Sequence, residues 1–170
     1  VTRPLFSYDY AVYLEYMNAY AAATEGPYFA TTEERTALEG RLQQLPRFAF
    51  FTRMLAPALG RVWETAAAAE AMRNVTVAGL VLAQIGEPQA SAWADPDGTR
   101  LPAELLGSWA HAATDPFTGE PLLVAIDPDG TLRVWSRGVD CTNDGGKGDL
   151  GNNQKAATDL VFRVRLGEKK

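Results

Sequence analysis

The chain has 170 residues, enough for one domain with a small extension, and 46% of them are hydrophobic and 22% charged, as in ordinary globular proteins. A chain of this length buries roughly 70% of its unfolded surface, so its core does not need disulfides or metals. The net charge of −5, without a basic cluster beyond Lys169–Lys170, argues against a nucleic-acid-binding protein, because phosphate binding needs concentrated lysine and arginine.

The N-terminal third is predicted to form a helical hairpin, residues 1–53. The first helix runs from Tyr8 to Ala23, with apolar residues every three or four positions, and Gly26–Pro27 ends it. The second helix begins at Thr31, because Thr31-Thr-Glu-Glu34 has the form of a capping box, and it ends before Pro46. We expect the aromatic stripe of this hairpin to pack on another element.

One long helix follows, from Pro57 to Ile85. Pro57 fits its first turn, where a missing N–H costs nothing, and the alanine run Ala66–Ala69 offers a slim surface for close packing. Past Val75 the helix is apolar on nearly every side, so we expect this end to be buried. The segment from Gln89 to Thr114 is predicted to be a loop with one short helix near Pro102–Leu106.

The pattern then changes to period two. Leu122, Val124 and Ile126 alternate with other residues, and the alternation resumes at Leu132 and Val134 after the turn sequence Asp127–Gly130, which predicts a β-hairpin. A third strand is predicted from Leu160 to Leu166, with a polar face at Val161, Arg163 and Arg165. Helices followed by strands give an α+β fold, with the long helix packed on a small antiparallel sheet.

No catalytic constellation is evident. His111 is the only histidine, and no Gly-x-Ser-x-Gly sequence is present, so a nucleophile with an adjacent base is not expected. Cys141 follows the carboxylate of Asp140, which disfavours its thiolate, and one cysteine excludes an internal disulfide. A pair of carboxylates brought together by folding stays open. We therefore predict a protein that is not an enzyme, without catalytic residues.

The loop after Val139 has the spacing of a cation-binding loop. Asp140, Thr142 and Asp144 lie at its first, third and fifth positions, with Gly145 at the sixth, and calcium takes about six to eight oxygen ligands. The twelfth position is Gly151 where an EF-hand has glutamate, so this is not an EF-hand. The alternative is a solvated loop in which Asp and Asn cap turns.

Four segments in this order carry a resemblance: Asp115-Pro-Phe-Thr-Gly-Glu-Pro-Leu122, Val134-Trp-Ser-Arg-Gly-Val-Asp140, Asp144-Gly-Gly146 and Asp159-Leu-Val-Phe162. Together with the long alanine-rich helix, they resemble the periplasmic part of type IV pilin-like proteins, especially the major pseudopilins of type II secretion. The resemblance covers roughly residues 55–166 and implies a pilin-like domain over residues 54–170, forming one compact unit with the helical extension.

The resemblance also implies a structural calcium ion, with Asp140 and Asp159 as ligands and Asp144 as a further candidate. Two features depart from the family. The apolar first half of the family's helix and its processing site are absent, and residues 1–53 are an addition. The loop from Cys141 to Thr158 is also longer than usual. Filament assembly is therefore not expected, and a membrane-anchored envelope protein with a pilin-like tail fits better.

The predicted function is that of a non-enzymatic, extracytoplasmic domain on the periplasmic side of a membrane, acting through protein partners in the cell envelope. It is expected to meet the membrane only through an anchor absent from this chain. No apolar run is long enough to span a bilayer and no signal peptide is present, and the opening Val-Thr-Arg in place of Met suggests a processed or truncated product. One alternative is a hydrolase-like or small-molecule-binding domain with a pocket between the N-terminal helices and the sheet, lined by Tyr10, Tyr13, Tyr16 and Tyr20. Another is a cytoplasmic interaction module.

Overall fold

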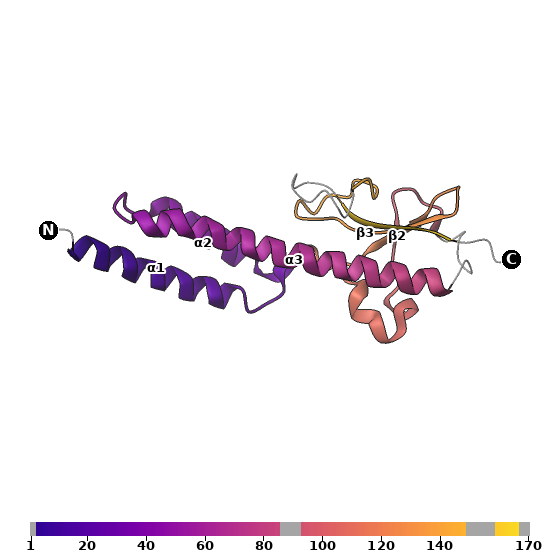
Figure 1. Ribbon diagram of the computed structural model, residues 1–170, viewed down its shortest axis with the longest axis horizontal. Coiled ribbons are helices and arrows are strands. Elements are labelled where there is room, and N and C mark those ends of the chain that lie inside the picture. Colours follow the sequence, from indigo (N-terminus) through magenta and orange to yellow (C-terminus); the bar gives the residue numbers. More distant parts are fainter. Residues whose placement is uncertain (1–2, 86–92, 149–158, 167–170) are drawn as a thin grey trace. The chain divides into compact units, whose positions relative to one another are not determined.

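The computed structural model describes residues 3–85, 93–148 and 159–166. The chain divides into two compact units, Val1–Ala66 and Ala67–Lys170, and the division falls inside the long helix α3, Phe50–Ile85 (Figure 1). The sequence had suggested a division after Arg53. Each unit is described below by itself. The predicted class is confirmed: N-terminal helices are followed by a long helix packed on a small antiparallel sheet.

The first unit is built from helices. It contains α1 (Arg3–Ala23), the short 3-10 helix η1 (Tyr28–Thr31), α2 (Thr32–Gln44) and the first part of α3. Its small core is formed by Tyr16, Leu38 and Ala56, one from each α-helix. The Tyr20 hydroxyl donates a hydrogen bond to the Leu59 carbonyl at 2.6 Å, which ties α1 to α3. The predicted helical hairpin is therefore present.

The predicted capping box at the start of α2 is wrong. Thr31 precedes the helix, but its hydroxyl donates to the Tyr28 carbonyl at 3.1 Å, and no side-chain hydrogen bond caps the helix. The cause is the preceding turn η1, which brings that carbonyl within reach of the threonine side chain. The local hydrogen bond competes with the capping interaction.

Helix α3 begins at Phe50, seven residues before the predicted start, so Pro57 lies inside the helix. The buried carboxylate of Asp9 on α1 accepts hydrogen bonds from the Phe51 amide at 2.8 Å and the Thr52 amide at 3.2 Å. Burial alone would raise the pKa of Asp9, but the bonds from the Thr52 hydroxyl and these amides lower it. A carboxylate from another helix therefore satisfies the first turn of α3.

The second unit contains a four-stranded antiparallel sheet in the order β1-β2-β3-β4. Its elements are the rest of α3, β1 (Thr99–Arg100), the 3-10 segment η3 (Ala103–Ala113), β2 (Leu123–Ile126), β3 (Thr131–Ser136) and β4 (Leu160–Arg165). The predicted hairpin and third strand are present, and Val124 pairs with Val134, which pairs with Phe162. Gly130 in the hairpin turn has a φ of +79°, which glycine adopts without strain.

Both faces of the sheet are covered. One face packs on α3, with η3 also contributing to the core (Figure 1); this core includes Val75, Ala78, Leu106 and Val134. The other face holds Trp135, Val161, Leu123 and Ala125. Val161, which the sequence placed on a polar face, is buried, because the segment around Gly98 and the loop at Gly146 close over neighbouring Trp135.

Helix α3 is long and apolar enough to cross a membrane by length and composition, with a mean hydropathy of 1.2, so the expectation that no segment qualifies is wrong. Glu70 and Arg73 interrupt the apolar residues of this helix in the sequence. In the structure, 39% of this apolar stretch is buried inside the protein. The same apolar character is what a core helix beneath a sheet requires.

We predict that Gly79→Ala destabilises the second unit, because an added Cβ would fall inside the ring of Phe162 on β4. Overpacking of this kind costs roughly 1–3 kcal/mol. The matched control is Gly60→Ala in the same helix, where a Cβ meets nothing within 4 Å and removal of a helical glycine stabilises by about 0.5–1 kcal/mol. Hydrogen exchange of the β4 amides should accelerate in Gly79→Ala alone. Equal exchange in both variants would contradict this packing.

Candidate functional site

A buried carboxylate binds the start of the loop between β3 and β4. Asp115, which is 1% exposed, lies in the turn before β2. Its Oδ1 accepts a hydrogen bond from the Ser136 hydroxyl at 2.8 Å, and its Oδ2 accepts one from the Arg137 amide at 2.9 Å. The Phe117 amide also donates to Oδ1 at 3.0 Å. The turn before β2 is thereby fastened to the end of β3.

A second buried carboxylate holds the glycine-rich part of the loop. Asp159, fully buried before β4, accepts hydrogen bonds on Oδ2 from the Asp144 amide at 3.0 Å and the Gly146 amide at 2.7 Å. Gly146 has a φ of +64°, and a Cβ on Gly148 would collide with the backbone carbonyl of Asp159. Glycine is therefore required for the loop to approach this carboxylate closely.

The other oxygen of Asp159 has no hydrogen-bond partner. Oδ1 is buried and unpaired in the part of the chain that the structure describes. Burial raises the pKa of Asp159 to about 6, and the nearby charges of Asp144 and Asp140 contribute to the rise. The hydrogen bonds from the Gly146 and Asp144 amides act in the opposite direction and lower the pKa. The charges of Asp144 and Asp140 therefore oppose ionisation of the Asp159 carboxyl.

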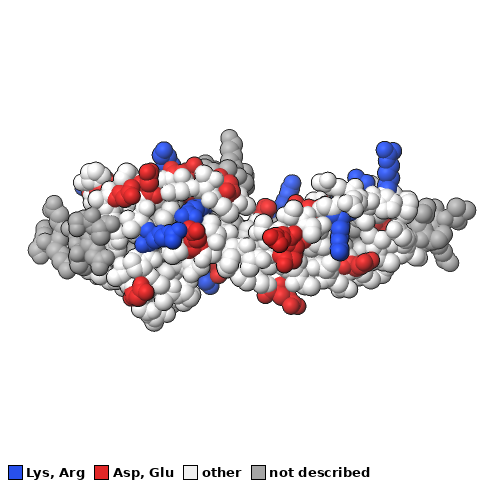
Figure 2. Space-filling view, turned by 180° about the vertical axis from the view of Figure 1, so that it is seen from behind, with Lys and Arg blue, Asp and Glu red and all other residues white. Residues whose placement is uncertain are grey.

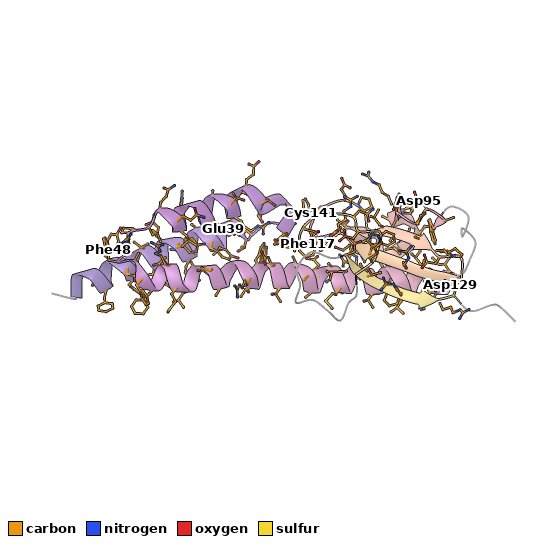
Figure 3. The ribbon with its side chains drawn as sticks, turned by 90° about the horizontal axis from the view of Figure 1, so that it is seen from above. Glu39, Phe48, Asp95, Phe117, Asp129 and Cys141 are labelled. Carbon is orange, nitrogen blue, oxygen red and sulfur yellow. The ribbon has the colours of Figure 1, made fainter. Side chains whose placement is uncertain are left out.

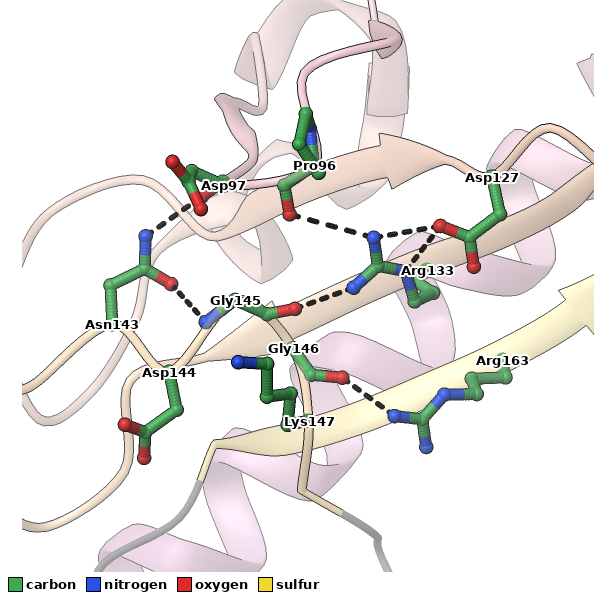
Figure 4. A pocket seen from close by; sticks show the side chains of 10 residues that line it. All are labelled: Pro96, Asp97, Asp127, Arg133, Asn143, Asp144, Gly145, Gly146, Lys147 and Arg163. Carbon is green, nitrogen blue, oxygen red and sulfur yellow. Dashed lines mark hydrogen bonds and ion pairs between the residues drawn. The ribbon is translucent and has the colours of Figure 1, made fainter.

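Two arginines of the sheet hold the carbonyls of the same loop. Arg133 donates to the Gly145 carbonyl at 2.5 Å and to the Asp127 carboxylate at 3.0 Å (Figure 4). Arg163 donates to the Gly146 carbonyl at 2.6 Å and to the Gly148 carbonyl at 2.8 Å. Arg133 and Arg163 are paired residues of β3 and β4, which places both side chains on one face of the sheet.

The arginines border an open polar cleft of about 770 Å³. Asn143 closes one side: its amide nitrogen donates to the Asp97 carbonyl at 2.7 Å, and its oxygen accepts from the Gly145 amide and from the Trp135 indole. The Asp144 carboxylate points away from Arg133 (Figure 4). The polar groups of the cleft are thus largely engaged in fixing the loop.

The structure brings the predicted metal ligands together only in part. The backbone amide of Asp144 donates a hydrogen bond to the Asp159 carboxylate. Asp140 is exposed, and its carboxylate accepts a hydrogen bond from the Thr142 amide at 3.1 Å, which is the turn expected of a solvated loop. Among the residues that the structure describes, no three acidic, histidine or cysteine side chains are placed to hold a metal ion. Gly151, at the twelfth loop position, lies outside the described residues.

The remaining candidate residues lie apart from this loop or at its edge. His111 is exposed on η3, with its ring centroid 6.0 Å from that of exposed Trp109. Cys141 is exposed, with a φ of +57°. Tyr16 and Tyr20 stack on each other beside a 420 Å³ cleft of the first unit, whereas Tyr10 is 65% exposed. The tyrosine stripe therefore does not converge on a single cavity.

Sequence reasoning missed the two arginines. The alternation predicts Arg163 on the polar face of the last strand, and no sequence pattern indicates a role for Arg133. The available signal was the register: once the strands are paired antiparallel, the two arginines are neighbours on the face that the glycine loop covers. Comparisons with protein-family models, with curated proteins and with solved structures found no match for this chain. The resemblance to pseudopilins therefore stays a prediction.

We predict that Asp159 makes stability depend on pH. Its pKa of about 6 in the folded state lies above the ordinary 3.8, so the folded state binds the proton more tightly. The free energy of unfolding should therefore fall as the pH rises from about 4 to 6, in buffer with EGTA. Asp159→Asn cannot ionise and should lose this dependence, as measured by urea denaturation at several pH values. The same slope in wild type and variant would contradict the assignment.

Proposed function

We propose that this chain is a non-enzymatic, extracytoplasmic, pilin-like domain that acts through contacts with other proteins of the cell envelope. The observation that carries the proposal is the pair of buried carboxylates, Asp115 and Asp159, at either end of the β3–β4 loop. Both belong to segments that carry the resemblance to pseudopilins. The long helix beneath an antiparallel sheet agrees with the same family.

The interactions within the site favour a structural role over catalysis. Asp115 is occupied by the end of β3, and the guanidinium groups of Arg133 and Arg163 bind loop carbonyls. Groups held in this way position backbone and are poorly suited to proton transfer, since a general acid or base must reach its substrate. Basic and acidic side chains are mixed on the face drawn in Figure 2, which favours protein partners over nucleic acid.

Within this proposal, a calcium ion stabilises the loop. Oδ1 of Asp159, which has no partner in the described part of the chain, supplies a buried oxygen, and Asp144 and Asp140 supply nearby negative charge. Calcium needs about six to eight oxygens, so loop carbonyls or water would complete the set. Arg133 and Arg163 already occupy the carbonyls of Gly145, Gly146 and Gly148, so the ion would bind on the Asp144 side of the loop.

Calcium is expected to raise the melting temperature of the protein and EGTA to lower it. Asp140→Ala and Asp159→Asn should each abolish the difference, because they remove a ligand. Glu104→Gln, a change of an exposed acid on η3, is the control and should leave the difference intact. Equal melting curves in calcium and EGTA for the wild type would rule out the ion site.

The location can be tested separately. Alkaline phosphatase fused to the C-terminus of the complete gene product should be active, because this reporter needs disulfides that form outside the cytoplasm. A fluorescent protein that folds only in the cytoplasm, fused at the same position, should stay dark. An inactive phosphatase with a bright fluorescent fusion would instead favour the cytoplasmic interaction module.

A further inference from the structure

Exposed aromatic side chains gather at the end of the first unit where α3 begins. We call this group the aromatic tip; it consists of Phe6, Tyr8, Phe48, Phe50 and Phe51. The four phenylalanines are 43–61% exposed. Their rings are in contact, with centroids 5.9 Å apart for Phe6 and Phe51 and 5.7 Å for Phe50 and Phe51. Phe48, labelled in Figure 3, meets Tyr8 at 5.3 Å.

The tip is a fixed surface because its two segments are bonded together. Asp9, between Tyr8 and Tyr10 on α1, accepts hydrogen bonds from the Phe51 and Thr52 amides of α3. Met54 and Leu55 on the next turn of α3 are also about half exposed and continue the apolar surface. An exposed apolar patch of this kind on a folded unit marks an interaction site.

Arginines are the charged residues next to the tip along the sequence of α3, while Glu15 of α1 lines a cleft with Tyr8 and Arg41. The only charged residues from Gly40 to Trp63 are Arg41, Arg47, Arg53 and Arg61, and all four side chains are exposed. In the part of the chain that the structure describes, none of the four forms an ion pair. Asp9, the acidic residue at the tip, is buried and hydrogen-bonded within the unit. The tip therefore presents aromatic rings together with the exposed positive charges of Arg47 and Arg53.

We propose that the aromatic tip binds the surface of an anionic lipid bilayer. Aromatic rings are enriched at the membrane–water interface, and neighbouring arginines are attracted to anionic headgroups. A second copy of the chain fits less well, because a symmetric contact would set each arginine patch against its twin. The proposal does not depend on the function proposed above.

Binding to vesicles tests the proposal directly. The 170-residue chain should sediment with vesicles of phosphatidylcholine and phosphatidylglycerol in equal amounts, and only weakly with phosphatidylcholine alone. The double variant Phe6→Ser, Phe50→Ser should bind these anionic vesicles at least about tenfold more weakly than the wild type, since it removes two inserted rings. Val62→Ser is the matched control, because Val62 is 65% exposed on the same helix, ~18 Å from Phe50.

A charge reversal separates electrostatic attraction from apolar insertion. Arg47→Glu at the tip should weaken binding to the anionic vesicles, whereas Arg61→Glu changes the net charge equally but lies two helical turns beyond Arg53 and should have a smaller effect. Raised salt should weaken wild-type binding. Circular dichroism confirms that each variant is folded before binding is compared.

Two results would overturn the proposal. One is equal binding of the wild type and the Phe6, Phe50 double variant to anionic vesicles. The other is no vesicle binding together with a dimer in solution that the double variant converts to a monomer, as measured by analytical ultracentrifugation. The second result would assign the aromatic tip to contact between copies of the chain.

Discussion

The second unit depends on carboxylates that take the place of strand pairing. Residues 137–148, the described part of the β3–β4 loop, form no strand pairing, and their backbone amides still need acceptors where they are buried. Asp159 accepts two of them at Asp144 and Gly146, and Asp115 accepts the amide of Arg137 at the other end. Because each carboxylate is itself buried, losing a loop amide would leave a charge without compensation, so loop and carboxylates are fixed together.

The carbonyls of the same loop need hydrogen-bond donors, and two arginines of the sheet supply them. Arg133 and Arg163 bind the carbonyls of consecutive glycine-loop residues, so these acceptors receive their hydrogen bonds from the sheet side. On the opposite side, Asp159 Oδ1 has no donor among the described residues, and Asp140 and Asp144 add negative charge. The calcium ion proposed above would use this acidic side of the loop. The loop can also fold without an ion, with Asp159 protonated at lower pH.

Local patterns predicted much of the fold, and long-range contacts account for what they missed. The period-two residues around Leu122 and Leu160 and the turn at Asp127–Gly130 predicted the strands, because successive side chains of a strand point to opposite faces of the sheet. The early start of α3 could not be foreseen, because its cap, Asp9, lies more than 40 residues away in the sequence. The site shows the same limit: acidic spacing indicated Asp140 and Asp144, but only strand register reveals the arginines that bind the loop.

In both units a buried aspartate accepts hydrogen bonds from backbone amides, but the arginines of the two units differ in their exposure. In the second unit, Asp115 and Asp159 accept hydrogen bonds from buried polar groups, and the arginines donate to the loop carbonyls. In the first unit, Asp9 caps α3 internally, which removes the negative charge of the tip from its surface and leaves Arg47 and Arg53 exposed beside aromatic rings. An internal capping interaction thus determines the charge of an external surface. The cap that starts α3 also gives the aromatic tip its positive character.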